Sequence, residues 1–181
     1  MLSFVIILIF AYNLYMGARR GLYLQGAYTL GYLVSLLFAR LFYAGLSRKL
    51  DLLIPYPSAT LDSHFVFFSN DVGLNLDQAF YRGCAFLLIL LIGWVLTHLV
   101  VMFFSDLAYL ELPQVDHTAN LVGSLFLAFI VCYFGVFCCF YLVAVIPIPG
   151  IQDALQKSWL ATLIVRYTPI LTKWITALWV A

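Results

Sequence analysis

The chain has 181 residues, a length that suggests one domain or at most two small ones. Hydrophobic residues make up 65% of it and charged residues 9%, against roughly 45–50% and about 25% in soluble domains. This composition predicts an integral membrane protein and excludes a disordered chain and a secreted disulfide scaffold. The 9 Lys and Arg are balanced by 8 Asp and Glu, so no broad basic field exists and we expect no nucleic-acid partner.

Four stretches are long and apolar enough to cross a bilayer, for which a helix needs about 20 residues. They cover residues 2–17, 22–43, 84–104 and 119–146. A cleaved signal peptide is the competing interpretation of the first. It is disfavoured because no Lys or Arg precedes the apolar run, and Arg19 and Arg20 follow it where a cleavage site would need small residues. The predicted fold is therefore an all-α, polytopic membrane protein with four transmembrane helices.

The pattern changes after the fourth span, which Pro147 and the Pro149-Gly150 pair end. We divide the chain into a transmembrane domain, residues 1–147, and an amphipathic C-terminal tail, residues 148–181. The tail pattern predicts one helix up to Pro169 and a second, shorter one after it, lying in the membrane interface or packed on the bundle. Apolar residues recur every four positions along the first helix, at Ile151, Leu155, Trp159, Leu163 and Tyr167. The predicted polar side holds Gln152, Asp153, Gln156, Lys157 and Arg166, with Asp153 and Lys157 spaced as an i,i+4 ion pair.

Small residues follow one face of the second span. They stand at intervals of four, at Ala27, Gly31, Ser35 and Ala39. Small residues at this spacing let two helix backbones approach closely in lipid. Gly93 in the third span and Gly123 in the fourth are the corresponding helix-packing residues there. The ridge predicts close packing within the chain or, alternatively, contact between copies in a homo-oligomer.

No pattern in the sequence predicts a reaction. Nucleophile–base sets, nucleotide-binding fingerprints and metal-ligand spacings are absent, so we expect no catalytic, cofactor-binding or metal-binding residues and no enzyme activity. Three polar residues within the spans form a candidate intramembrane site: Asn13, His98 and Asn120. His98 is ionisable and lies inside the third span, where a charge is costly. The position of His98 predicts either a hydrogen bond to a neighbouring helix or a role in moving protons or ions.

Several short motifs, in this order and spacing, make the chain resemble the colicin V production (CvpA-type) membrane proteins, in particular the forms of Gram-positive bacteria. The matching stretches are residues 15–22, 54–58, 93–97, 120–123, 146–152 and 167–169. Arg19, Arg20 and Gly21 form the hairpin motif of the family. One position departs from it, because Leu127 stands where relatives often have a second glycine after Gly123, which argues against a close GxxxG contact there.

The resemblance implies four spans in the bacterial plasma (inner) membrane. It also implies a process, the production and export of a bacteriocin (a toxin) or envelope homeostasis, but no molecular activity. We therefore expect a non-enzymatic scaffold or oligomeric component whose partners are the lipid bilayer and either further copies or another membrane protein. The alternative is a small channel or transporter subunit that uses Asn13, His98 and Asn120.

The two arguments on orientation conflict. Most Lys and Arg residues lie on the side of the termini, which places both termini in the cytoplasm by the positive-inside rule. Some proteins with a domain resembling this chain carry a C-terminal protease domain outside the cell, which implies that both termini lie outside. We favour the second orientation.

Overall fold

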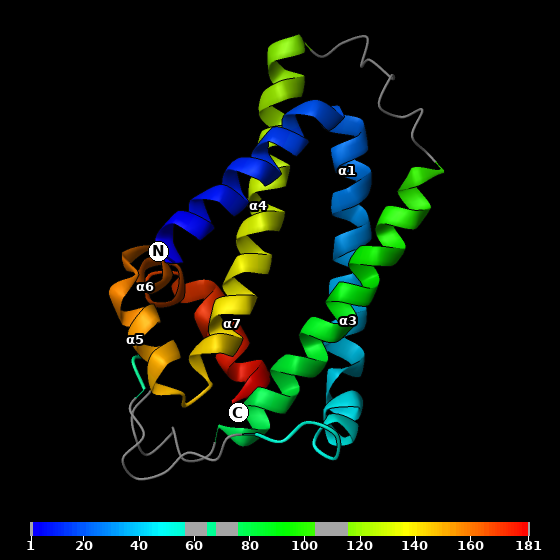
Figure 1. Ribbon diagram of the computed structural model, residues 1–181. Helices are drawn as coiled ribbons and strands as arrows, with labels where there is room; N and C mark the ends of the chain where they lie inside the picture. The colour runs from blue at the N-terminus through cyan, green and yellow to red at the C-terminus, as the bar shows by residue number, and fades with distance from the viewer. Residues whose placement is uncertain (1, 57–64, 68–75, 104–115, 181) are drawn as a thin grey trace.

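The computed structural model describes residues 2–56, 65–67, 76–103 and 116–180. Within these ranges the regular elements are all α-helices, which confirms the all-α prediction for this part of the chain. The helices are α1 (Leu2–Leu50), α3 (Asp77–Met102), α4 (His117–Ala144), α5 (Pro149–Lys157), α6 (Trp159–Arg166) and α7 (Pro169–Trp179). Figure 1 shows α3 and α4 diverging toward the top of the view, where α1 bends, and the three short helices gathered around the C-terminal half of α4.

Three helices are long and apolar enough to cross a membrane, namely α1, α3 and α4. At 1.5 Å per residue, the 26 residues of α3 extend about 39 Å and the 28 residues of α4 about 42 Å. Both exceed a hydrocarbon core of roughly 30 Å, so these helices must tilt or reach into the headgroup region. The predicted third and fourth spans correspond to α3 and α4, except that α3 begins earlier, at Asp77. The predicted end of the third span, Phe104, lies outside the described residues.

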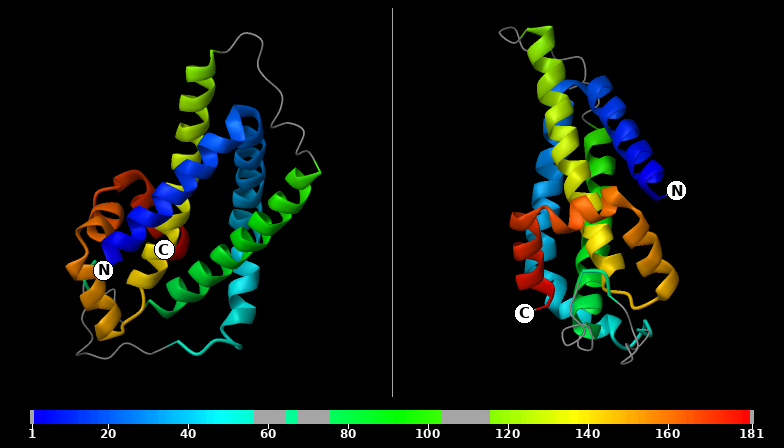
Figure 2. Two further views of the ribbon diagram at one scale, coloured as in Figure 1. Left: turned by 45° about the horizontal axis from the view of Figure 1, so that its top comes forward. Right: turned by 90° about the vertical axis from the view of Figure 1, so that its left-hand side faces the viewer.

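The first two predicted spans form α1, a 49-residue helix with a sharp bend at Gly21. Gly21 has φ 71° and ψ 171°, a region that only glycine adopts without strain. The joint predicted between the spans that end at Gly17 and begin at Leu22 is thus reduced to one residue. We call residues 2–20 the first limb and residues 22–50 the second limb. The two limbs diverge from the bend (Figures 1 and 2), and the second continues to Leu50 instead of ending at Tyr43.

The bent helix α1 is the central packing element of the molecule. Its first limb packs on α4, where Phe10 contacts Phe129, and its second limb packs on α3, where Gly31 contacts Thr97. It packs on α3 and α4 far more extensively than they pack on each other. Its long course leaves Arg48 and Lys49 in the last turn, where cations interact favourably with the carbonyl end of the helix dipole.

The tail differs from its prediction, because three helices replace the expected two. The predicted helix between residues 151 and 168 breaks at Ser158, which has extended backbone angles and caps α6 by accepting a hydrogen bond from the Ala161 N–H at 3.3 Å. Beyond this break, the apolar residues that were predicted to share one face with Ile151 and Leu155 no longer face the bundle. Trp159 and Tyr167 are 65% and 72% exposed, whereas Ala161, Ile164 and Val165 are buried in their place.

The end of α7 packs into the bundle. The fully buried ring of Trp179 lies 5.7 Å from the Phe86 ring on α3 and 5.6 Å from the Tyr141 ring on α4, measured between centroids. Gly83 makes room for it, since a Cβ atom there would lie 2.9 Å from the indole. An Arg82 guanidinium N–H donates to the Trp179 carbonyl at 3.2 Å. Of the two positions predicted for the tail, packing on the bundle therefore describes α7.

Candidate functional site

The small-residue ridge of α1 faces α3, and two of its members meet α3 at very short range. A Cβ atom added to Gly31 would overlap the Thr97 Cγ2 atom, and one added to Gly93 would overlap the Ser35 Oγ atom. Each glycine thus receives a hydroxyl-bearing side chain from the opposite helix. Farther along the limb Ala39 is fully buried, while Ala27, on the side of the bend, is half-buried.

The hydroxyl groups at this crossing are used within their own helices. The Ser35 hydroxyl donates to the Gly31 carbonyl at 2.8 Å, and the Thr97 hydroxyl donates to the Gly93 carbonyl at 2.7 Å. Such bonds to the preceding turn satisfy a hydroxyl in an apolar environment without a second helix. The ridge therefore allows close approach of the two backbones, and both hydroxyl groups are satisfied within their own helices.

A second close crossing joins the region of the bend to α4. A Cβ atom at Gly17 would lie 2.5 Å from the Ala128 Cβ atom and 3.3 Å from the Ser124 carbonyl oxygen. Gly123 contacts Leu22, whose Cδ1 atom would lie 2.9 Å from an added Cβ. The contact is thus made without the second glycine that Leu127 replaces.

The hairpin motif surrounds the bend and is fastened to α4 by Asn120. The Leu22 N–H, at the start of the second limb, donates to the Asn120 Oδ1 atom at 2.7 Å. This bond satisfies one of the first-turn N–H groups that a helix leaves without an internal partner. The guanidinium groups beside the bend rest on aromatic rings, Arg19 5.9 Å from the Tyr15 centroid and Arg20 4.0 Å from the Tyr28 centroid.

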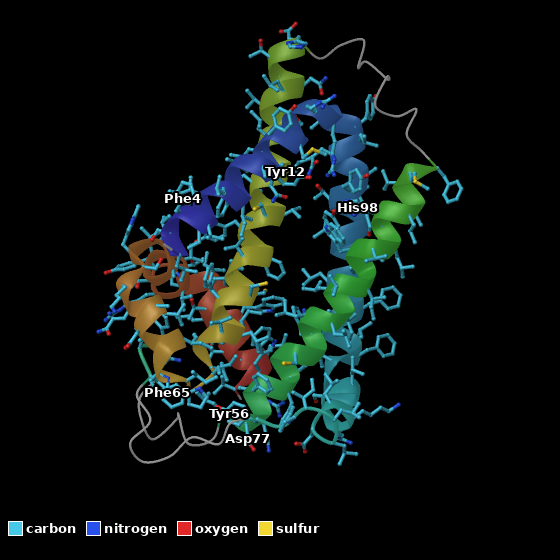
Figure 3. All side chains as sticks on the ribbon, in the orientation of Figure 1. Phe4, Tyr12, Tyr56, Phe65, Asp77 and His98 are labelled. Atoms are coloured by element: carbon cyan, nitrogen blue, oxygen red, sulfur yellow. The ribbon has the colours of Figure 1, made fainter. Side chains whose placement is uncertain are left out.

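His98, labelled in Figure 3, belongs to an aromatic cluster that connects this bend to α3. Its ring centroid lies 4.7 Å from that of Tyr28 and 4.2 Å from that of Trp94. The His98 Nδ1 atom lies 3.0 Å from the Trp94 carbonyl oxygen and 3.5 Å from the Tyr32 hydroxyl on α1. Because a carbonyl only accepts, the shorter contact places a hydrogen on Nδ1. Arg20, Tyr28 and His98 thus follow one another from the bend into the α1–α3 interface.

The three residues of the candidate intramembrane site have separate hydrogen-bond partners. The Asn13 side-chain amide donates to the Ile9 carbonyl of its own helix at 2.9 Å. Asn120 bonds the start of the second limb, and His98 contacts Trp94 and Tyr32. The structure therefore does not bring the three residues together as a shared polar lining.

Two side chains for which the sequence analysis predicted no buried role, Gln152 and Tyr56, bind the backbone at the C-terminal end of α4. Gln152, 1% exposed, donates from Nε2 to the carbonyls of Ala144 at 3.1 Å and Ile146 at 2.7 Å. Its Oε1 atom accepts from the Val66 N–H at 3.1 Å. Tyr56 donates to the Val145 carbonyl at 3.0 Å, and burial raises the pKa of Tyr56 to about 12, so the donating proton stays in place. The polar spacing of Gln152 suggested a solvated side chain, and no local signal indicated this buried role.

Arg40 is a further residue without an assigned role in the sequence analysis. It lies on the second limb beside the fully buried Ala39, and its side chain is exposed. A long cationic side chain at such a position reaches along the helix toward the headgroups while its methylene groups stay in apolar surroundings.

Comparison with known proteins matches nearly the whole chain. A family model described as colicin V production protein matches residues 2–169. The uncharacterized transmembrane protein YshB of Bacillus subtilis (strain 168) is 27% identical over 179 residues, which cover 99% of this chain and 97% of that protein. No solved structure matches. Together with the three long apolar helices, these similarities place the protein in a membrane.

Proposed function

Because the chain belongs to the colicin V production protein family, we propose that it is a non-enzymatic membrane scaffold that supports bacteriocin production and export or envelope homeostasis. The family match across residues 2–169 carries this proposal. The close crossings at Gly31 and Gly93 support it, because the small and hydroxylated residues there make contacts between helices and hydrogen bonds within them. The proposed location is the plasma (inner) membrane.

A scaffold must retain a partner, either a second copy or another membrane protein. The lipid-facing sides of α1 and α3 offer broad apolar surfaces for such a contact. Purification of the tagged full-length protein in mild detergent is expected to bring a stoichiometric protein with it or to give a crosslinked oligomer. A protein that purifies as a monomer without a partner, from cells that carry out the process, would contradict the proposal.

We propose further that α1 crosses the membrane twice, giving four spans with α3 and α4. The first limb has 19 residues and extends about 28 Å, close to a core of roughly 30 Å and within the range of about 17–25 residues for a transmembrane helix. The second limb has 29 residues and extends about 43 Å, which exceeds that core. The bend at Gly21 then lies at one membrane surface. In the tail, α5, α6 and α7 have 9, 8 and 11 residues, and each is too short to cross.

The tail is expected to remain on one side of the membrane. Topology reporters fused after Gly150 and after Ala181 should therefore give the same side, and we expect that side to be outside the cell. Reporters on opposite sides would show that the tail crosses. A fusion after Leu50 serves as a control, because four spans place it on the same side as the other two.

A channel or transporter subunit is the second candidate function, and two observations favour it. Gln25, 3% exposed, has a buried Oε1 atom without a hydrogen-bond partner among the described residues. On the same limb, the Tyr28 ring and the Tyr32 hydroxyl both contact His98. A buried acceptor of this kind calls for a water molecule or an ion. Ion flux through liposomes that contain the purified protein distinguishes this function from a scaffold.

His98→Gln separates the two functions by removing the titrating group while keeping a hydrogen-bonding side chain. The scaffold predicts near-normal folding, because Gln can still donate to the Trp94 carbonyl, and near-normal activity in a bacteriocin-production or envelope-stress assay. The channel predicts a folded protein without activity. His117→Gln, at the exposed start of α4, is the matched control. A folded, inactive His98→Gln protein beside an active His117→Gln protein would reject the scaffold.

A further inference from the structure

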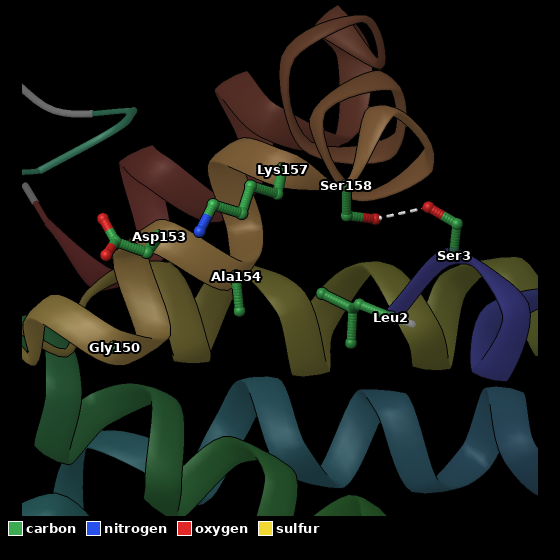
Figure 4. Close-up of a pocket in the computed structure, with 7 residues that line it drawn as sticks. All are labelled: Leu2, Ser3, Gly150, Asp153, Ala154, Lys157 and Ser158. Atoms are coloured by element: carbon green, nitrogen blue, oxygen red, sulfur yellow. Dashed lines mark hydrogen bonds between the residues drawn. The ribbon is translucent and has the colours of Figure 1, made fainter.

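A cavity of about 440 Å³ opens between the first turn of α1 and one face of α5 (Figure 4). Its polar lining consists of Ser3, Asp153, Lys157 and Ser158. The Ser3 and Ser158 hydroxyl groups are hydrogen-bonded at 2.9 Å and connect the two walls. The cavity lining therefore contains a carboxylate, an ammonium group and two hydroxyl groups.

The two charged side chains of the cavity, Asp153 and Lys157, form no direct ion pair. The i,i+4 spacing predicted an ion pair, but within the described part of the chain no hydrogen bond joins the Asp153 carboxylate to the Lys157 ammonium (Figure 4). Both side chains are exposed, four residues apart on α5, which is a separation of about 6 Å along the helix axis. Each charge is free to pair with one end of a small zwitterion.

The surroundings of the cavity favour a lipid as the source of that zwitterion. Exposed apolar side chains follow the lining residues directly in the chain, with Phe4 after Ser3 (64% exposed) and Trp159 after Ser158. Tryptophan favours the boundary between acyl chains and headgroups. The α4 helix exceeds the hydrocarbon core by about 12 Å, and α5 turns back beside its C-terminal end (Figure 1), so the cavity lies near one end of this span.

We propose that this cavity binds the headgroup of a zwitterionic aminophospholipid of the phosphoethanolamine type. The Lys157 ammonium pairs with the phosphate, and the Asp153 carboxylate accepts hydrogen bonds from the primary ammonium. A choline headgroup has no N–H to donate, and a phosphoglycerol headgroup brings no cation to Asp153. The acyl chains lie along the exposed side of the first limb. The site is independent of any role in bacteriocin export.

Native mass spectrometry of the full-length protein with equal amounts of three lipids tests the site. The lipids carry identical acyl chains and phosphoethanolamine, phosphocholine or phosphoglycerol headgroups. We expect the phosphoethanolamine lipid to be retained about tenfold more than the other two, as one added charge-assisted hydrogen bond would give. Equal retention of all three would overturn the proposal. Displacement by equimolar soluble glycerophosphoethanolamine would show that the ligand is a free metabolite and would overturn the lipid assignment.

Three variants assign the contacts. Asp153→Asn is expected to reduce retention of the phosphoethanolamine lipid to the phosphocholine level and to leave the phosphocholine lipid unchanged. Lys157→Gln should reduce the retention of all three lipids, whereas Lys157→Arg should preserve it. Gln156→Ala, at an exposed position of α5 outside the cavity lining, is the control. Preserved lipid preference in a folded Asp153→Asn protein would also overturn the proposal.

Discussion

Replacement of Gly31 by Leu is expected to lower the melting temperature of the detergent-solubilised protein strongly. Even a methyl group at this position would overlap Thr97 Cγ2 and lie 2.7 Å from Thr97 Oγ1. A leucine must therefore push α1 and α3 apart along the whole ridge. Overpacking of an interior costs about 1–3 kcal/mol in general, and we expect the upper end or more where two backbones meet.

Gly26→Leu is the matched control for this prediction. Gly26 lies on the same limb, and no atom of the described residues comes within 4 Å of an added Cβ, so a side chain there enters open space. The melting temperature of this variant should stay close to that of the wild type. Crosslinking tests the alternative of a homo-oligomer contact, in which Gly31→Leu would remove a crosslinked species without lowering the melting temperature. If neither quantity changes, the ridge is not an interface.

Replacement of Gly21 by Ala is expected to destabilise the protein by about 1–3 kcal/mol, the cost of holding a non-glycine residue in this backbone region. The cost is conformational, because an added Cβ would meet only the Asn120 side chain among the described residues, at an ordinary contact distance of 3.8 Å. Relief of the strain would move the bend and break the bond from the Leu22 N–H to Asn120. Thermal unfolding in detergent measures the loss of stability. The formation of an engineered disulfide between α4 near Asn120 and the start of the second limb measures the movement of the bend.

Gly26→Ala again provides the comparison, since it makes the same chemical change within a helix and without positive φ. It should leave stability unchanged or raise it by up to about 1 kcal/mol. Equal effects of Gly21→Ala and Gly26→Ala would contradict the assignment of the bend to the glycine backbone.

The helices could be predicted from the sequence to different degrees. The long apolar runs predicted α3 and α4 to within a few residues at the described ends, apart from the earlier start of α3, because apolar length is a local property. The tail prediction failed at Ser158, where a side-chain cap ended one helix and began the next. The apolar spacing continued across this break, so periodicity alone could not reveal it.

The candidate sites show where such prediction stops. Small residues at Gly31 and Gly93 could be selected from the sequence, but their pairing with Thr97 and Ser35 required the structure. Asn13, His98 and Asn120 were grouped because each is polar within an apolar run. They are separated because each satisfies its hydrogen bonds with a different local partner.

The sequence by itself determined the membrane environment and the helical class, since hydrophobicity and backbone satisfaction in lipid are local properties. It placed the joint of the first two spans between Gly17 and Leu22, and the structure located the bend at Gly21. The tertiary structure alone decided which side of each helix faces its neighbours. The three long helices are apolar on nearly all sides, so no polar stripe marks the outer face of their described residues. Contacts between the helices decide it: Gly31 packs against Thr97, and Gly93 packs against Ser35. Gln152 is buried against the end of α4, although Asp153 beside it in the sequence is exposed.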